Sequence, residues 1–149
     1  MKIFSTQIRV RFGHVDPAGI AYYPRIFEYL HAVTEELWEQ HVGVRYDQLI
    51  MVQKIGFPLV HSEVDFKAPL RFGDRPIARV TCFHLGTSSL GLHFVFEHNG
   101  EIALDARMTT VCTDLVALKS RPIPAEWRAK LEELREPPAD SQASTARAR

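Results

Sequence analysis

The residues best placed to do chemistry lie where a predicted turn leads into a predicted helix. Asp16 is the carboxylate of this turn, and the helix begins near Tyr22 and Tyr23. Amides in the first helical turn have no acceptor within the helix, and the helix dipole makes that end positive. Such N–H groups suit a developing oxyanion, and the same dipole favours an ionised Asp16. A carboxylate beside amide donors is the pair of groups that thioester hydrolysis requires.

The turn also has a purely structural interpretation. Asp16, Pro17 and Gly19 stand at the first, second and fourth positions of an ideal type I turn, which would account for all three residues. His14, two residues before the aspartate, is an isolated loop histidine of the kind that is ordinarily solvated. The sequence alone leaves both interpretations of the turn open.

Three aromatic side chains cluster at the start of the helix. Tyr22, Tyr23 and Phe27 would favour a flat aromatic acyl group through stacking and apolar burial. Large aromatic residues are equally common in protein cores, so core packing explains them as well. A flat aromatic acyl group therefore ranks first and a short aliphatic one second.

Hydrophobic periodicity predicts the elements that hold these residues. Ile8, Val10 and Phe12 alternate with arginines, which indicates a strand with one buried face. After Pro24 the apolar spacing becomes helical, and Gly43 is a suitable helix end.

Four more strands follow the helix, and Asn99-Gly100 marks a tight hairpin between the last two. They are predicted at residues 60–68, 77–85, 90–96 and 101–113.

One amphipathic helix is the available cover for the apolar face of such a sheet. The predicted fold is therefore α+β of the hotdog type, a five-stranded antiparallel sheet wrapped around one long helix. A short C-terminal helix opens at Pro124 and carries Trp127 and Leu131. We expect one domain over residues 1–135 and a disordered tail over 136–149, because the tail has almost nothing to bury.

The composition excludes several classes of function. Eighteen basic and eighteen acidic residues balance, so no net field favours nucleic acid or an anionic membrane. The chain lacks a membrane-length apolar run and a signal-like start, so a cytoplasmic protein is expected. Its histidines lack metal-site spacing, and no GxSxG, P-loop or GxGxxG motif occurs, so no metal or cofactor is expected. Cys82 and Cys112 should be buried free thiols.

A long block around the turn is similar to a known signature. Residues 10–24 read Val-Arg-Phe-Gly-His-Val-Asp-Pro-Ala-Gly-Ile-Ala-Tyr-Tyr-Pro and lead into the helix. Residues 66–70 and 73–74 resemble the next region of the same proteins. The block resembles the 4-hydroxybenzoyl-CoA thioesterase family, and the similarity extends over about residues 3–134.

The resemblance implies roles for particular residues. Asp16 matches the catalytic aspartate, acting as nucleophile or general base, and the Tyr23 backbone N–H matches the amide that polarises the thioester carbonyl. The expected substrate-binding residues around them are His14, Pro17, Gly19, Tyr22 and Phe27. Two features depart from the family pattern. His14 stands where many relatives have an acidic residue, and residues 84–89 lack the basic side chains that meet the nucleotide in some relatives.

The resemblance also implies a substrate and an assembly. The substrate is an acyl-CoA, so coenzyme A enters as part of the substrate rather than as a cofactor. Self-association to a homodimer or homotetramer is implied, with active sites between subunits. Three alternatives stay open: a non-catalytic acyl-binding protein, an acyl carrier protein thioesterase, and a dehydratase that uses His31 or His41.

Overall fold

The computed structural model describes residues 1–138, so residues 139–149 of the predicted tail lie outside the described residues. The strands are β1 (Phe4–Gln7), β2 (Ile55–Gly56), β3 (Leu59–Phe66), β4 (Ile77–Leu85), β5 (Ser89–His98), β6 (Glu101–Val111), β7 (Thr113–Asp114) and β8 (Lys119–Ser120). The helices are α1 (Tyr23–Leu37) and α2 (Ala125–Glu132), with shorter helical turns at Phe12–His14, Trp38–Val42 and Gln48–Val52. None of the helices in this described part is long and apolar enough to cross a membrane.

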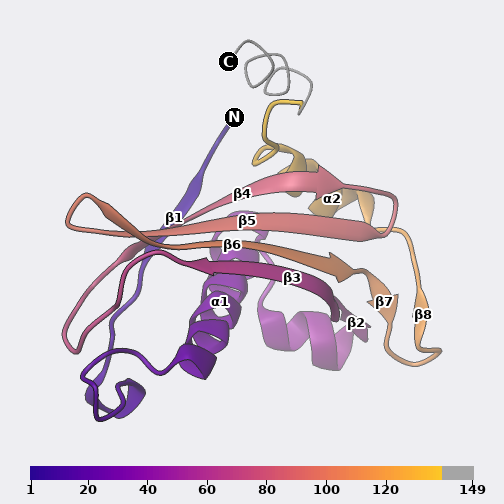
Figure 1. The fold of residues 1–149 in the computed structure, drawn as a ribbon. Helices are drawn as coiled ribbons and strands as arrows, with labels where there is room; N and C mark the ends of the chain where they lie inside the picture. The colour runs from indigo at the N-terminus through magenta and orange to yellow at the C-terminus, as the bar shows by residue number, and fades with distance from the viewer. Residues whose placement is uncertain (139–149) are drawn as a thin grey trace.

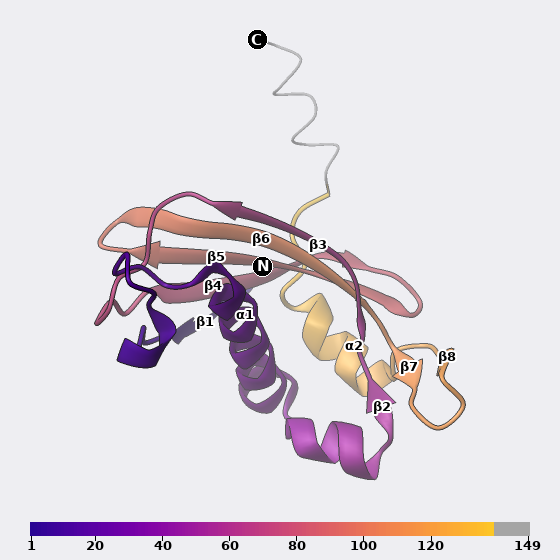
Figure 2. The ribbon, with the colours of Figure 1, turned by 60° about the horizontal axis from the view of Figure 1, so that its bottom comes forward.

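Five strands form one antiparallel sheet in the order β1-β4-β5-β6-β3, and β2, β7 and β8 form a small second sheet. Figure 1 shows the large sheet curving over α1. Figure 2, turned to bring the underside forward, shows α1 and α2 on the same concave side. This is the predicted hotdog fold, with its five-stranded sheet, long helix and short C-terminal helix.

The core lies between α1 and the concave face of the sheet. Alternate residues of β5 are buried, as the period of two requires, and the apolar stripe of α1 is buried against them. The buried side chains of these two elements include Ile26, Leu30, Val33, Leu37, Leu90, Leu92, Phe94 and Phe96. The helix and sheet thus bury the faces that their sequence patterns predicted.

Two predicted chain reversals are confirmed by the backbone. Asn99 and Gly100 have φ of 51° and 77°, so both central residues of the β5–β6 hairpin adopt positive φ. Gly43 has φ of 89° and caps the helical turn that extends α1. Cys82 and Cys112 are buried free thiols, as predicted.

The first strand lies earlier in the chain than predicted. β1 ends at Gln7, although Ile8 and Val10 still donate backbone hydrogen bonds of 2.9 Å to the segment before β4. Val10 is buried, but Phe12 is 78% exposed, so the predicted alternation fails at its last residue. The reason is local, because residues 12–14 form a short helical turn that directs the Phe12 ring outward onto Phe72.

The edge strand β3 is largely exposed. Only β6 pairs with it, and none of its residues is buried. Val60 is 60% exposed and Phe66 is 56% exposed. β3 therefore presents apolar side chains at an open sheet edge.

The C-terminal segment is fastened to the sheet beyond α2. Trp127 of α2 packs edge-on against Trp38 with ring centroids 5.4 Å apart. Glu136, the first residue of the predicted tail, donates its backbone N–H to the Cys82 carbonyl oxygen at 2.8 Å. Its carboxylate lies 2.7 Å from the Thr81 hydroxyl and 2.8 Å from the His93 ring.

Candidate functional site

The Asp16 turn has the geometry that its residue types predict. The Gly19 N–H donates to the Asp16 carbonyl oxygen at 2.8 Å, and Gly19 takes φ of 82°, which favours glycine. The Ala18 N–H donates to Asp16 Oδ1 at 2.8 Å, so the side chain caps its own turn. Asp16 Oδ2 has no hydrogen-bond partner within residues 1–138. One carboxylate oxygen thus serves the turn, and the other stays available for chemistry.

The first residues of α1 offer one free amide. The Tyr22 N–H is occupied, because it donates to the His14 carbonyl oxygen at 2.9 Å. Pro24 has no N–H to donate. The Tyr23 N–H, by contrast, has no acceptor among the described residues. Of the two amides considered at the sequence level, only that of Tyr23 can hold an oxyanion.

Asp16 and Tyr23 line the same cavity, which has a volume of about 360 Å³. Its walls come from the turn, the start of α1, the end of β3 with the segment after it, and β6. The lining residues are Asp16, Ile20, Ala21, Tyr23, Ile26, Phe66, Lys67, Ala68, Pro69, Leu70, Ala103 and Leu104. The structure therefore brings the two predicted catalytic residues to one mostly apolar pocket.

Lys67 is a site residue that the sequence reasoning did not assign. It is the cationic residue among those that line this cavity and lies just after β3, where its backbone N–H donates to the Ala103 carbonyl oxygen at 2.9 Å. Lys67 belongs to the segment 66–70 that carried part of the family resemblance. Its placement beside Asp16 depends on the pairing of β3 with β6, which no local pattern specifies.

His14 holds the turn against α1. The Arg11 N–H points at His14 Nδ1 at 3.3 Å, and the Tyr29 hydroxyl lies 2.9 Å from the same nitrogen. A backbone N–H can only donate, so Nδ1 accepts and the ring carries its hydrogen on Nε2. Burial raises the pKa of Tyr29 to about 12, so its hydroxyl stays protonated and shares the Nδ1 lone pair with the Arg11 N–H. His14 does not line the 360 Å³ cavity.

The other predicted binding residues lie around this cavity rather than in it. Pro17 and Gly19 are exposed in the turn. Tyr22 is exposed and packs on the Tyr23 ring, with centroids 5.2 Å apart. Phe27 is 40% exposed and lines a separate, larger cavity. The alternative interpretation of Tyr22, Tyr23 and Phe27 as core residues is therefore wrong.

The two helix histidines considered for a dehydratase lie away from Asp16. His41 hydrogen-bonds the Lys130 carbonyl oxygen at 2.8 Å and pairs with Glu133 at 3.3 Å, beneath α2. His31 pairs with Glu35 at 3.4 Å on α1 and lines the separate, larger cavity that Phe27 also lines. Neither histidine lines the cavity that contains Asp16.

Comparison with known proteins identifies the family. The sequence profile of the thioesterase-like superfamily matches residues 10–131. The chain belongs to this superfamily. A gentisyl-coenzyme A thioesterase of known structure is 30% identical, with a TM-score of 0.77 over 84% of this chain and 99% of its own.

Further relatives support the assignment. A thioesterase superfamily structure from Jannaschia sp. CCS1 is 26% identical, with a TM-score of 0.83 over 90% of this chain and 94% of its own. A 1,4-dihydroxy-2-naphthoyl-CoA hydrolase of Synechocystis sp. is 27% identical over 92% of this chain and its own entire length. The chain is thus a thioesterase of the hotdog fold, and the predicted resemblance is confirmed at the level of the superfamily.

Proposed function

We propose that this thioesterase is a cytoplasmic enzyme that hydrolyses an acyl-CoA, with Asp16 as the catalytic carboxylate and the Tyr23 N–H as the carbonyl-polarising group. The observation that carries the proposal is that Asp16 and Tyr23 line the same cavity, and that one Asp16 carboxylate oxygen and the Tyr23 amide have no partner within residues 1–138. The names of the gentisyl-CoA and dihydroxynaphthoyl-CoA relatives support a CoA thioester as the substrate class.

The geometry serves the reaction in either of two ways. The Tyr23 N–H donates to the thioester oxygen, which gains negative charge as the carbonyl carbon is attacked. Asp16 Oδ2 either attacks that carbon, forming an acyl–aspartyl anhydride that water then cleaves, or takes a proton from the attacking water. Both routes break the carbon–sulfur bond and release the free acid and the CoA thiol.

An aromatic, 4-hydroxybenzoyl-like acyl group is the proposed preference, with short aliphatic groups second. Tyr23 lines the cavity, and the exposed rings of Tyr22 and Phe27 flank the helix start, so a flat ring can pack against them. Both relatives named above carry aryl acyl groups in their names, which supports the same ranking.

We further propose that the active enzyme is a homodimer or homotetramer built on the β3 edge. Leu59, Val60 and Phe66 expose apolar surface there, and an uncovered apolar edge strand invites pairing with another chain. Phe66 also lines the cavity that contains Asp16. A second subunit on this edge would therefore cover one wall of the proposed active site.

Thiol release from a panel of acyl-CoAs tests the proposed reaction. Benzoyl-CoA and 4-hydroxybenzoyl-CoA should give the highest kcat/KM, acetyl-CoA and butanoyl-CoA lower values, and the matching acyl carrier protein substrates lower values still. Tight binding of acyl-CoAs without thiol release would instead show a non-catalytic binding protein. Larger kcat/KM for short aliphatic groups than for benzoyl-CoA would reverse the proposed preference.

A further inference from the structure

A second cavity of about 640 Å³ lies further along α1 and β6 than the cavity of the proposed thioester site. Tyr23 lines the smaller cavity and Phe27, one helical turn further along α1, lines the larger one. On β6 the same step runs from Leu104 to Met108, two inward-facing positions further along the strand. The two cavities thus follow one another along α1 and β6.

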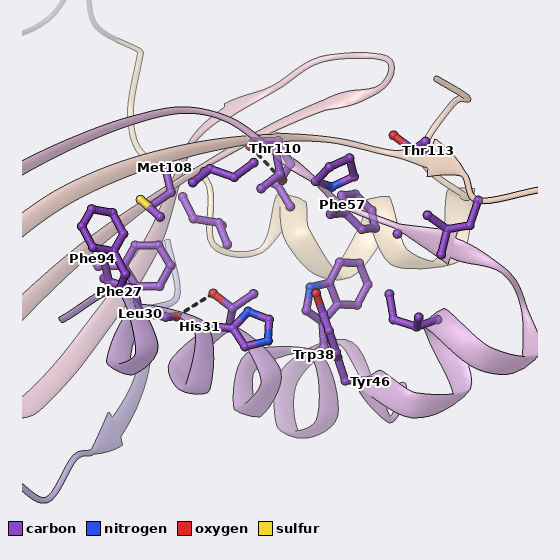
Figure 3. Close-up of a pocket in the computed structure, with 18 of the residues that line it drawn as sticks. Phe27, Leu30, His31, Trp38, Tyr46, Phe57, Phe94, Met108, Thr110 and Thr113 are labelled. Carbon is purple, nitrogen blue, oxygen red and sulfur yellow. Dashed lines mark hydrogen bonds between the residues drawn. The ribbon is translucent and has the colours of Figure 1, made fainter. Parts of the chain in front are cut away.

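Figure 3 shows Phe27, Phe94 and Met108 together at the end of the larger cavity nearer the start of α1. Trp38 and Tyr46 lie toward the other end, and Thr110 and Phe57 face them from the sheet side. Phe27 therefore lies on the side of the cavity toward the thioester site. A group that extends past the Phe27 ring would enter the larger cavity.

Most residues that line the larger cavity are apolar, and three threonines among them already use their hydroxyl groups. The hydroxyl of Thr34 donates to the Leu30 carbonyl oxygen at 2.8 Å, and that of Thr113 donates to a carbonyl oxygen of β6 at the same distance. The Thr110 hydroxyl likewise points at the carbonyl oxygen of Leu90, 3.4 Å away. These three hydroxyl hydrogens are directed at the main chain. The other polar groups of the lining belong to His31, which pairs with Glu35 at 3.4 Å, and to the rings of Trp38 and Tyr46, so most of the wall offers an apolar ligand only apolar contacts.

An apolar volume of this size is unusual in a packed domain. The cavity is open to solvent, since its lining residues Phe27 and Leu118 are 40% and 76% exposed, so part of its apolar wall faces water instead of other side chains. Here the large rings of Trp38 and Phe57 pack on each other, with centroids 4.9 Å apart, and leave the volume between α1 and the sheet open. An apolar ligand would restore the missing contacts.

The length of the groove sets the size of that ligand. From Tyr23 to Phe27 the helix rises about 6 Å, and from Phe27 to Trp38 about another 16 Å. An extended chain advances roughly 1.2 Å per bond, since one residue of an extended polypeptide has three backbone bonds and spans about 3.5 Å. A saturated chain starting at the thioester carbonyl therefore passes Phe27 after about five carbons, and later carbons enter the cavity.

We propose that the larger cavity is an acyl-chain site, which adds medium- to long-chain aliphatic acyl thioesters to the substrates of this enzyme. The inference rests on the proposed function, because it takes the thioester carbonyl to lie between Asp16 and Tyr23. Short aliphatic chains end before the cavity and gain nothing from it. Chains longer than about six carbons bury their ends there, and each buried methylene group should raise the affinity roughly fourfold.

A series of saturated acyl-CoAs from two to twelve carbons tests the proposal by activity. Their kcat/KM should stay low to about six carbons and then rise by at least tenfold towards ten carbons. Thr110→Phe places a ring in the cavity and should remove this rise. Thr109→Phe is the matched control, because Thr109 pairs with Gly91, whose outer side is covered by Phe83, and it does not line the cavity. The control should keep the rise.

Binding measurements separate this proposal from the proposed reaction. Decyl-CoA thioether, which cannot be hydrolysed, should bind at least tenfold more tightly than ethyl-CoA thioether to the wild type and to Asp16→Asn. If no acyl-CoA is hydrolysed but this difference exists and Thr110→Phe removes it, the reaction fails and the chain site stands. Met108→Trp fills the same space from the next inward position and replaces Thr110→Phe if that variant does not fold.

Two results would overturn the chain site. One is equal binding of the two thioethers by the wild type. The other is a chain-length dependence that persists in folded Thr110→Phe or Met108→Trp. The same holds if the substitution changes the oligomeric state and leaves the chain-length dependence as it was. That last outcome would assign the cavity to a subunit interface.

Discussion

Asp16→Asn tests whether the turn residue is also the catalytic carboxylate. The backbone bonds of the turn, from Gly19 N–H to the Asp16 carbonyl oxygen and from Asp16 N–H to the Ile20 carbonyl oxygen, do not involve the side chain. Asparagine retains an Oδ1 that can accept the 2.8 Å bond from the Ala18 N–H. What the substitution changes is the other oxygen, which becomes an NH₂ group that can neither take a proton from water nor attack a carbonyl.

The expected losses of stability and of rate differ greatly in size. Loss of one partly exposed charge before a helix should lower the free energy of unfolding by at most about 1 kcal/mol, which is about 2–4 °C in Tm for a chain of this length. Loss of a general base lowers the rate about 10²–10⁴-fold, and loss of a nucleophile can lower it further. A fall in kcat of at least a hundredfold, about 2.7 kcal/mol of activation free energy, is therefore expected.

The assay measures kcat, KM and Tm of Asp16→Asn beside those of Asp16→Ala. The alanine variant also loses the bond to the Ala18 N–H, so it should be less stable than the asparagine variant by about 0.5–1.5 kcal/mol while having a similarly low kcat. Near-normal kcat in a well-folded Asp16→Asn would refute the reasoning. Asp16 would then be a turn residue only, since asparagine is nearly as good as aspartate at that position.

Three further predictions concern other parts of the structure. Tyr23→Pro removes both the free N–H and the ring, and Tyr22 already has φ of −63° and ψ of 128°, which suit a residue before proline. The kcat value should fall about 10²–10³-fold, whereas Tyr23→Ala, which loses the ring but keeps the amide, should not show this fall. Val60→Lys at the exposed β3 edge should shift the protein to monomers in light scattering and lower its activity, and a fully active monomer would contradict the shared site. Glu136→Ala should lower Tm by about 2–8 °C, because the Thr81 hydroxyl and the Nδ1 side of His93 lose their carboxylate partner, while His93 Nε2 keeps Asp105 at 2.9 Å. Partial burial alone would raise the pKa of Glu136, but hydrogen bonds from Thr81 and His93 and the charges of His93 and Arg107 lower it. The stabilisation is therefore present above the ordinary glutamate pKa and is lost as the pH falls through the lowered pKa. If Tm fell with decreasing pH in the same way in Glu136→Ala as in the wild type, this account would be contradicted.

Local sequence patterns predicted the parts of the fold that local physics determines. The helix, the Asn99-Gly100 hairpin and the turn at Asp16 follow from side-chain periodicity and from the φ preferences of single residues. The direction of the Phe12 ring could not be predicted in this way. Its alternation with Val10 is that of a strand, and only the helical turn at residues 12–14 reverses it.

The candidate site was predictable where one segment supplies it and not where two segments meet. Asp16 and Tyr23 are seven residues apart in sequence, so the turn and the helix start bring them together directly. Lys67 and Phe66 reach the same cavity only because β3 pairs with β6 and lies beside the helix start. That the Tyr22 amide is occupied could not be predicted either, since its acceptor is the carbonyl oxygen of His14 across the turn.

The position of the site at an open sheet edge connects its chemistry with assembly. The largest stabilisation of the transition state in such a reaction comes from a fixed hydrogen-bond donor in a place from which water is excluded. This stabilisation weakens where solvent reaches the donor. Tyr23 is 64% exposed, and Phe66 on the neighbouring edge is open to solvent as well. A single subunit therefore holds Asp16 and the Tyr23 amide in place but leaves them wet. A second subunit on the β3 edge would bury apolar surface and also exclude water from the site. Association and turnover should therefore depend on the same residues of this edge.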